Sequence, residues 1–306
     1  MFGTMLNSSV NDNIRGTLFM VFAMAAFAVE DMFIKAAADH LSLGTLLILF
    51  GSGGMLIFMV MATLKGEAIY NPALFSRVQL IRSAFEIVGR LFFALAITLS
   101  PLSSASAILQ ATPLVVVLGG ILFFKERVGW QHWLAIMAGF IGVLMIVRPG
   151  LDSFSAASIF AVISTIGFAG RDLATRAAPP TLTNFQLGIY GFMVLIICGA
   201  ILQAWYAESV DLAPLLDSSA GLKTACAIIF GVIAYNFLTK AMRTGEISMV
   251  TPFRYTRLIF AFVLGIIVFN ERPDLLTLLG GLVIAGSGIF LLWQSRKRTK
   301  KLVRSY

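Results

Sequence analysis

The sequence predicts an all-α integral membrane protein with ten transmembrane helices, arranged as two inverted repeats of five helices each. Hydrophobic residues make up 58% of the 306 residues and charged residues only 12%, whereas soluble proteins contain about 25% charged residues. The apolar residues form stretches of about 20, which is the length of a helix that crosses a bilayer. In addition, short motifs of the first half recur in the second half.

The ten expected helices follow one another with short connections. They occupy Gly16–Ala37, Leu43–Thr63, Gln79–Thr98, Ser103–Phe124, Trp130–Val147, Ala156–Thr175, Thr183–Trp205, Leu222–Met242, Ile247–Phe269 and Leu275–Trp293. The two longest connections contain Pro72 and Pro214, and proline among polar residues is typical of loops. No connection is long enough for a soluble domain.

The distribution of lysine and arginine predicts the orientation of the chain. If the N-terminus is cytoplasmic, the inner side receives most basic residues, among them the six of the tail Arg296–Arg304. The outer side then receives only Lys35, Arg148, Lys223 and Arg272. Because basic connections stay in the cytoplasm, we expect both termini there and a basic cytoplasmic tail at residues 294–306. The net charge of +8 therefore does not indicate nucleic-acid binding.

One internal match lies at the ends of the first and sixth expected helices. They read FAVEDMFIKAA (Phe27–Ala37) and FAGRDLATRAA (Phe168–Ala178). Asp31 matches Asp172, and a cation followed by two alanines ends both segments. A second match lies at the ends of the fourth and ninth expected helices.

In that second match, Glu126-Arg127 corresponds to Glu271-Arg272. Ser103 corresponds to Ser248 at the same offset. Order, spacing and charge agree together, which favours a true repeat over a chance match in apolar sequence.

The matches indicate that residues 15–147 and 156–293 are two copies of one five-helix unit. Because five is an odd number, the second copy must enter the membrane from the side opposite to the first. Inverted repeats of this kind occur in carriers that work by alternating access, with the substrate site near the membrane midplane between the halves.

The third expected helix carries a stripe of charge. Arg82, Glu86 and Arg90 lie four residues apart and share one helix face. A charge in a membrane-spanning helix costs several kcal/mol unless it is paired or faces water, so we expect this face inside the bundle. Arg82 lies within reach of the cytoplasmic surface, whereas Arg90 lies near the midplane.

Charged residues of the first, sixth and ninth helices complete the candidate site. The predicted substrate-binding residues are Arg90, Arg257, Glu86, Glu30, Arg254, Tyr255 and Gln110. The residues assigned to coupling or to structural charge pairs are Asp31, Asp172, Arg171 and Arg82.

The two midplane arginines indicate the chemistry of the site. We expect Arg90 and Arg257 to flank the cavity, with Glu30 and Glu86 as partners. A guanidinium group binds carboxylates and phosphates and stacks on planar rings. Glu30 or Glu86 is a candidate for coupling transport to protons, because burial and a neighbouring arginine shift the pKa of a carboxylate in opposite directions.

Structural interpretations of the same residues remain open. The stripe of the third helix would also suit an ion ladder that holds this helix in the bundle. Arg171 and Arg254 would suit anchors to lipid headgroups. Pro113 frees a backbone carbonyl within its helix, which is compatible with a break beside a cavity or with a plain kink. The many glycines favour close helix packing.

The sequence lacks the common motifs of metal, nucleotide and hydrolase sites. It contains no HExxH, paired cysteines, P-loop or Gly-x-Ser-x-Gly. We therefore expect no metal and no cofactor, and a solute or proton gradient rather than ATP as the energy source. An intramembrane enzyme or a channel is the alternative from another functional class.

Two segments carry a resemblance to a known family. They are KERVGWQHWLAIMAGFIGVLMI (Lys125–Ile146) and NERPDLLTLLGGLVIAGSGIFLL (Asn270–Leu292), and each begins at a Glu-Arg turn between the last two helices of its unit. With these paired units the chain resembles the drug/metabolite transporter superfamily, in particular proteins with two EamA domains. The resemblance implies that 15–147 and 156–293 are EamA-like repeats in a bacterial inner membrane.

The same resemblance implies a small-molecule substrate. Family members move amino acids and their derivatives, nucleotide-related compounds such as S-adenosylmethionine, vitamins such as riboflavin, and polyamine-like or metallophore molecules. The segments Gly167–Pro179 and Leu109–Leu114 look most like the branch with riboflavin and S-adenosylmethionine uptake carriers. A metabolite, drug or amino-acid exporter of the same fold is the alternative, because inverted repeats work in both directions.

Overall fold

The structure is a computed structural model that describes residues 2–124, 130–148, 155–176, 182–207, 209–210, 212–216, 218–244 and 251–304. Every regular element within these ranges is a helix, as the sequence predicts. Some residues of the repeated motifs lie outside the described residues, among them Glu126, Arg127, Ala177, Ala178 and Ser248.

The described helices follow the expected apolar stretches closely. They are α1 (Phe2–Ala37), α2 (Leu43–Leu64), η1 (Pro72–Phe75), α3 (Arg77–Leu99), α4 (Leu102–Leu109), α5 (Thr112–Phe124), α6 (Trp130–Val147), α7 (Ala157–Arg176), α8 (Asn184–Tyr206), η2 (Ala213–Leu216), α9 (Ser218–Thr244), η3 (Thr251–Tyr255), α11 (Thr256–Phe269) and α12 (Leu275–Arg304). α1 and α12 extend beyond the apolar stretches, because hydropathy marks only the bilayer part of a helix and polar residues can prolong it.

Six helical segments of the described chain are long and apolar enough to cross a membrane. They are Ile14–Ala37, Leu43–Leu64, Leu102–Gly120, Ala157–Ala174, Asn184–Tyr206 and Ser219–Ala241. α3 is not among these six helices, because its charged residues Arg82, Glu86 and Arg90 make it less apolar than the others. The helices and their apolar surfaces agree with a multi-pass membrane protein.

The fourth expected helix is interrupted rather than kinked. α4 ends at Leu109 and α5 begins at Thr112, with Gln110 and Ala111 in a turn between them. Pro113 follows directly, and proline has no backbone N–H to continue the hydrogen bonds of α4. The described part of the ninth expected helix likewise contains a 3-10 turn, η3, before α11.

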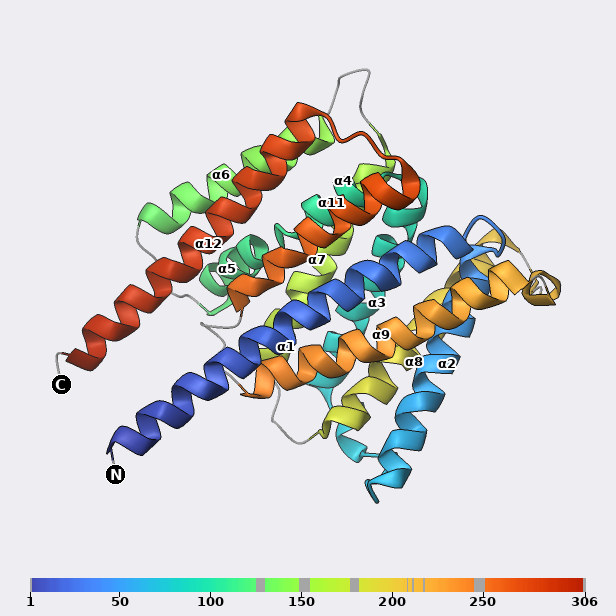
Figure 1. Cartoon of the computed structure of the whole chain (residues 1–306), viewed down its shortest axis with the longest axis horizontal. Coiled ribbons are helices and arrows are strands. Elements are labelled where there is room, and N and C mark those ends of the chain that lie inside the picture. Colours follow the sequence, from blue (N-terminus) through green and yellow to red (C-terminus); the bar gives the residue numbers. More distant parts are fainter. Residues whose placement is uncertain are drawn as a thin grey trace.

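Helices that are distant in the sequence pack as pairs. The main pairs are α1 with α9, α2 with α8, α3 with α7 and α6 with α12 (Figure 1). If the two predicted five-helix units are exchanged, α1 takes the place of α7 and α9 that of α3, so the α1–α9 pair becomes the α7–α3 pair. The pairs α2–α8 and α6–α12 each remain the same under this exchange. Both termini lie at the same end of the bundle (Figure 1).

Glycines permit the closest of these helix contacts. A Cβ atom on Gly142 of α6 would lie 2.8 Å from the carbonyl oxygen of Gly280 on α12. A Cβ atom on Gly167 of α7 would lie 2.5 Å from the backbone nitrogen of Gly89 on α3. The close-packing prediction is confirmed at these positions.

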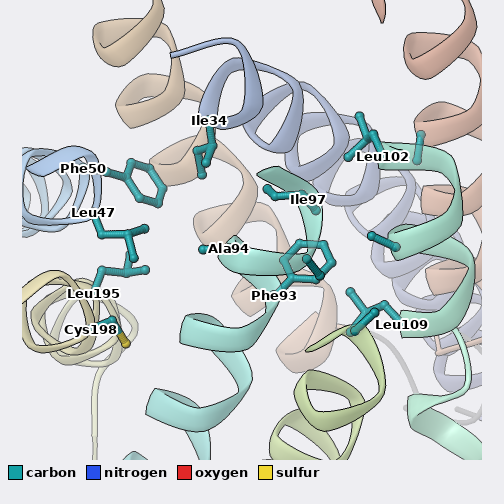
Figure 2. Packing of buried hydrophobic residues seen from close by; sticks show 14 of the residues in the cluster. Ile34, Leu47, Phe50, Phe93, Ala94, Ile97, Leu102, Leu109, Leu195 and Cys198 are labelled. Atoms are coloured by element: carbon teal, nitrogen blue, oxygen red, sulfur yellow. The ribbon is translucent and has the colours of Figure 1, made fainter. Parts of the chain in front are cut away.

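Buried apolar side chains fill the space where the pairs meet. Figure 2 shows Leu47 and Phe50 of α2 beside Leu195 of α8, and Phe93 and Ile97 of α3 facing the same region. These five side chains also border a cavity, so the hydrophobic core and the candidate site share one wall.

Candidate substrate site

A cavity of about 100 Å³ lies in the interior of the bundle. Its wall combines apolar side chains with charged and polar ones from both predicted halves. The charged and polar lining residues are Glu30, Asp31, Arg90, Gln110, Thr112, Arg171, Tyr235, Arg254 and Arg257. The aromatic lining residues besides Tyr235 are Phe27, Phe50, Phe93 and Phe168.

Two adjacent carboxylates of α1 face different helices. Asp31 is directed to Arg257 of α11, and Glu30 to Arg90 of α3. Successive residues of a helix point about 100° apart, so one helix supplies a carboxylate to each neighbour. Gly231 of α9 provides the space for Glu30, because a Cβ atom there would lie 3.3 Å from its carboxyl carbon.

Asp31 and Arg257 form a tight ion pair. Arg257 Nη2 donates to Asp31 Oδ2 over 2.6 Å, and its Nε donates to the same oxygen over 3.2 Å. The guanidinium carbon lies 5.0 Å from the ring centre of Phe27 and 5.2 Å from that of Phe93, within the range of cation–π attraction. The prediction that Glu30 and Glu86 partner the two midplane arginines is confirmed for Arg90 and wrong for Arg257, since α1 presents Asp31 rather than Glu30 to α11.

A second tight group connects α7 with η3. Arg171 donates from Nη2 and Nε to Asp172 Oδ1 over 2.8 and 3.0 Å, and Arg254 Nη1 lies 3.5 Å from Asp172 Oδ2. Arg171 also lies over the ring of Phe168, 4.9 Å from its centre. Both arginines have a partner inside the bundle, which disfavours the interpretation as lipid anchors.

The charges around Arg90 are paired much more loosely. Arg90 Nη1 lies 3.9 Å from Glu30 Oε1, and Arg90 Nε lies 3.9 Å from Glu86 Oε1. These separations exceed the length of a hydrogen bond. Glu30 Oε2, Glu86 Oε1 and Arg90 Nε are buried without a hydrogen-bond partner, although Glu86 also lies 3.7 Å from Arg171.

Arg82 differs from its sequence-based expectation. It is only 9% exposed, and its Nη2 lies 3.4 Å from Glu86 Oε2. The prediction that Arg82 reaches the membrane surface is therefore wrong, because the carboxylate four residues later on α3 gives it a partner within the bundle. α3 itself begins after Ser76, whose hydroxyl accepts a hydrogen bond from the backbone of Gln79.

The cavity brings together most of the predicted substrate-binding residues. Those that line it are Arg90, Arg257, Glu30, Arg254 and Gln110. Asp31 and Arg171, assigned by sequence to coupling or structure, line it as well. Glu86 and Asp172 contact lining residues without bordering the cavity themselves, and Arg82 contacts Glu86. Tyr255 is buried outside the lining, with its hydroxyl lacking a partner.

Sequence reasoning missed the aromatic part of the wall. Phe27, Phe50, Phe93 and Phe168 look like ordinary apolar residues of membrane helices, and nothing in the pattern separates them from lipid-facing phenylalanines. Phe27, Phe93 and Phe168 each lie three residues from a charged residue, and this spacing was the one available signal.

A second polar cluster lies at the end of the bundle away from both termini (Figure 1). We call it the Glu271 clamp and define it as Lys35, Leu102, Ser103 and Glu271. Glu271 accepts hydrogen bonds from Leu102 N (2.7 Å), Ser103 N (3.1 Å) and Ser103 Oγ (2.7 Å). Lys35 Nζ donates to it over 3.2 Å and also to the carbonyl oxygen of Ser100 over 2.7 Å.

The clamp joins the end of α1, the start of α4 and the turn between α11 and α12. Desolvation raises the pKa of Glu271, but the hydrogen bonds from Ser103 and Leu102 and the charge of Lys35 outweigh it, so the pKa lies below its ordinary value. Ser103 and Glu271 are both matched residues of the repeat, yet nothing in their pattern indicates that they are in contact.

The described residues contain no group of three or more His, Cys, Asp or Glu side chains arranged to hold a metal ion. Cys198 is buried and Cys226 is partly buried, and both are free thiols. The chemistry available at the cavity is therefore that of arginines, carboxylates and aromatic rings.

Comparison with known proteins places this arrangement in context. The EamA-like transporter family matches the chain twice, over residues 14–148 and 154–294. The chain is 23% identical to the S-adenosylmethionine uptake transporter of Rickettsia prowazekii, over 95% of this chain and 97% of the relative. It is 25% identical to the riboflavin transporter of Vibrio cholerae, over 94% and 96%. It is 26% identical to the pseudopaline exporter of Pseudomonas aeruginosa, over 94% and 97%.

The arrangement of the helices is also found in a solved protein. A crystal structure superimposes with a TM-score of 0.62 at 16% identity, over 92% of this chain and 98% of the other. A likeness at this identity concerns the fold alone, and the relatives' names indicate transporters rather than enzymes.

Proposed function

The chain belongs to the EamA-like transporter family, and we propose that it is a secondary carrier for a small polar organic metabolite in the cell inner membrane. The observation that carries the proposal is the cavity at which arginines and carboxylates of α1, α3, α7, η3 and α11 meet. Charges are rare inside membrane proteins and mark substrate or ion pathways.

We propose that transport proceeds by alternating access between two inverted five-helix repeats, residues 15–147 and 156–293. The symmetric pairing of α1 with α9 and of α3 with α7 supports this arrangement. We propose ten membrane spans on the basis of the ten apolar stretches, and both termini with the basic tail 294–306 in the cytoplasm on the basis of the distribution of lysine and arginine.

The size of the cavity supports a cycle with a conformational change. A volume of about 100 Å³ is smaller than the roughly 300–1,000 Å³ of pockets that hold drug-sized ligands. Binding of a metabolite as large as those named for the relatives would therefore be accompanied by movement of helices. Interruptions at Gln110 and Tyr255 place irregular backbone beside the site, as in other carriers.

The substrate-binding residues of the proposal are Arg90, Arg257, Glu30, Arg254 and Gln110, which line the cavity, and Glu86 and Tyr255 next to it. Asp31, Asp172, Arg171 and Arg82 hold the charged helices together, and proton coupling through Glu30 or Glu86 belongs to the same proposal.

S-adenosylmethionine and riboflavin are the first candidate substrates, because relatives at 23–25% identity carry these names. Export is the second candidate, because another relative is named as an exporter.

The test is solute flux with the purified protein in liposomes. Radiolabelled S-adenosylmethionine, riboflavin and a panel of amino acids are offered under counterflow, with protein-free liposomes as the control. We expect saturable accumulation of at least one unchanged solute. Chemical conversion of the solute would indicate an enzyme, and unsaturable conductance a channel. A proton gradient that changes the rate would support proton coupling.

A further inference from the structure

The Glu271 clamp holds the connection between α3 and α4 from two sides. Lys35 donates to the carbonyl oxygen of Ser100 over 2.7 Å, while Glu271 accepts from the backbone of Leu102 over 2.7 Å and from the hydroxyl of Ser103 over 2.7 Å. Lys35 and Glu271 also pair with each other over 3.2 Å. Glu271 belongs to the second predicted repeat and its partners to the first, so the clamp joins the two halves at the end of the bundle away from both termini.

The backbone after α11 directs Glu271 to this position. Asn270 has a φ of 51°, a left-handed conformation that asparagine tolerates, and the N–H of Glu271 donates to the carbonyl oxygen of Gly265 over 3.0 Å. The chain therefore turns back over α11, and the missing Cβ of Gly265 leaves room for the carboxylate. The free N–H groups at the start of a helix favour a negative charge, so the turn delivers the carboxylate to the start of α4.

A second hollow, of about 350 Å³, lies beside the clamp, and we call it the outer hollow. Its wall includes Lys35 of the clamp, Thr98 near the end of α3 and Phe269 at the end of α11. Lys35 Nζ lies 5.0 Å from the centre of the Phe269 ring, within the range of cation–π attraction. Since α1, α3 and α11 all end here, the outer hollow belongs to the same end of the bundle as the clamp (Figure 1).

A thin apolar wall separates the outer hollow from the inner cavity. Ile34 and Ile97 line the cavity, and the next residues of the same helices, Lys35 and Thr98, line the outer hollow. Ile34 and Ile97 are 5% and 1% exposed, and Leu102, whose backbone the clamp holds, is fully buried (Figure 2). A solute that leaves the cavity toward this end must displace this wall.

The clamp is connected to the cavity through two helices. Asp31 and Lys35 lie one turn apart on α1, and Asp31 lines the cavity. α4 begins at Leu102 in the clamp and ends at Leu109, directly before Gln110 of the cavity wall. Movement of α1 or α4 away from Glu271 would therefore change the cavity wall and the outer end of the bundle together.

We propose that the Glu271 clamp is the outer gate of the carrier. While the clamp is formed, Glu271 holds α1 and α4 against the turn between α11 and α12, and its release connects the outer hollow with the cavity. The inference rests on the proposed carrier function and adds to it the residues that close one end. Polar contacts suit a gate, because water reaches Lys35 and Glu271, whose side chains are 17% and 9% exposed, and replaces their hydrogen bonds at a small net cost.

The first experiment measures access to the cavity from outside. Ala94→Cys places a thiol on the cavity wall, in a Cys226→Ser background that removes the partly buried native thiol. A membrane-impermeant methanethiosulfonate is added to spheroplasts, and the labelling rate is followed by mass spectrometry. We expect labelling about tenfold or more faster in Glu271→Gln, as the loss of a hydrogen-bonded charge predicts. Ser103→Ala, which keeps the backbone contacts, should accelerate labelling by a smaller factor.

Two controls distinguish an opened gate from a loosened protein. Asp274→Asn removes a carboxylate three residues after Glu271 that pairs with Arg148 of α6, and asparagine still caps α12 at Thr277. Its labelling rate should equal that of the intact clamp. Cys198 is a buried native thiol of the hydrophobic core, and in proteins without Ala94→Cys it should stay unlabelled in every variant.

The second experiment locks the clamp without substituting it. Lys35 Nζ and Glu271 Oε1 are 3.2 Å apart, so a water-soluble carbodiimide can condense the amine and the carboxyl into an amide, while the carbodiimide takes up the water and becomes a urea. Labelling at Ala94→Cys should fall to the fraction of protein that escapes cross-linking, as counted by mass spectrometry. Lys35→Arg is the control, because a guanidinium does not couple, and its labelling should not respond to the carbodiimide.

The outcomes separate the gate from the proposed function. Unchanged labelling in Glu271→Gln, or acceleration seen only in inside-out vesicles, overturns the outer gate. Equal acceleration in Asp274→Asn or at Cys198 overturns it too, because labelling then reports loosening. If Glu271→Gln does not reach the membrane, the cross-linking result decides, and labelling that the cross-link leaves unchanged overturns the gate.

Flux measurements test the carrier function independently. Saturable counterflow of a solute together with unchanged labelling would keep the carrier and overturn the gate. Labelling that follows the clamp, with no flux of any solute in the panel, would contradict the carrier function while the clamp still closes the cavity.

Discussion

Glu271 is a half-buried carboxylate near a lysine and Glu30 is a buried carboxylate near an arginine, and their surroundings differ sharply. Glu271 accepts three hydrogen bonds from Leu102 and Ser103 and one from Lys35. Glu30 has an arginine at 3.9 Å and one oxygen without any partner. Both lie between elements of the two predicted halves, so location alone does not explain the difference.

The difference separates a charge that stabilises the fold, Glu271, from a charge with unused hydrogen-bonding capacity, Glu30. A buried carboxylate with complete hydrogen bonds recovers the free energy that desolvation takes from it, whereas a partly paired one does not. The Glu271 clamp therefore acts as a structural connection among α1, α4 and the turn before α12. The Glu30–Arg90 pair keeps unused hydrogen-bonding capacity at some expense of stability.

The largest effect is expected from Arg90→Ala. If Arg90 binds a charged group of the substrate, its truncation costs roughly 2–5 kcal/mol of binding free energy, which corresponds to about 30-fold or more in affinity. Transport in liposomes should fall by at least about 30-fold, with the amount of protein in the membrane unchanged and Arg272→Gln as the control. Disappearance of the protein from the membrane would favour a structural ion ladder along α3 instead.

The comparison between the two carboxylates can be tested directly by neutralising each. Glu271→Gln should lower the free energy of unfolding by roughly 1.5–3 kcal/mol, the value of a hydrogen bond to a charged group. Glu30→Gln should lower it less or raise it, because that charge is poorly paired. The apparent unfolding temperature in detergent measures both. Equal destabilisation by the two substitutions would contradict the idea that Glu271 stabilises the fold more than Glu30 does.

A smaller effect is expected from Gly265→Ala, which acts on the clamp indirectly. A Cβ atom at Gly265 would lie 2.5 Å from Glu271 Oε2, so the carboxylate must shift and lengthen some of its hydrogen bonds. Unfolding should occur at a lower temperature than in the wild type but above that of Glu271→Gln. Gly286→Ala on α12 is the matched control, because a Cβ atom there meets nothing within 4 Å. A similar loss in both variants would point to helix packing rather than to the clamp.

The smallest effect concerns pH. The pKa of Glu271 lies below its ordinary value of 4.5, so its contribution to stability is present above that value and is lost as the pH falls through the folded-state pKa. The difference in unfolding temperature between wild type and Glu271→Gln should therefore shrink between pH 5 and about pH 3. A difference that stays constant over this range would show that Glu271 does not titrate there.

Much of the fold could be predicted because membrane helices leave a strong pattern in one dimension. The stretches at Leu43–Thr63 and Trp130–Val147 agree with α2 and α6 within one residue, since apolar length and flanking polar residues mark where a helix crosses the bilayer. Pro113 indicated an irregularity in the fourth helix, and α4 and α5 separate next to it. Whether that irregularity was a kink or a break depended on neighbouring helices.

The sequence by itself determined which residues carry charge into the membrane, because Arg90, Glu30 and Arg257 interrupt apolar stretches and no partner is needed to recognise them. Only the tertiary structure decided how they pair. Adjacent residues of α1 point to different neighbours, so Asp31 meets Arg257 tightly while Glu30 meets Arg90 loosely. The Glu271 clamp likewise joins residues that are distant in the sequence: Glu271 lies 168 positions from Ser103 and 236 positions from Lys35. Such contacts depend on the rotation and tilt of packed helices, which hydropathy and motif spacing do not encode.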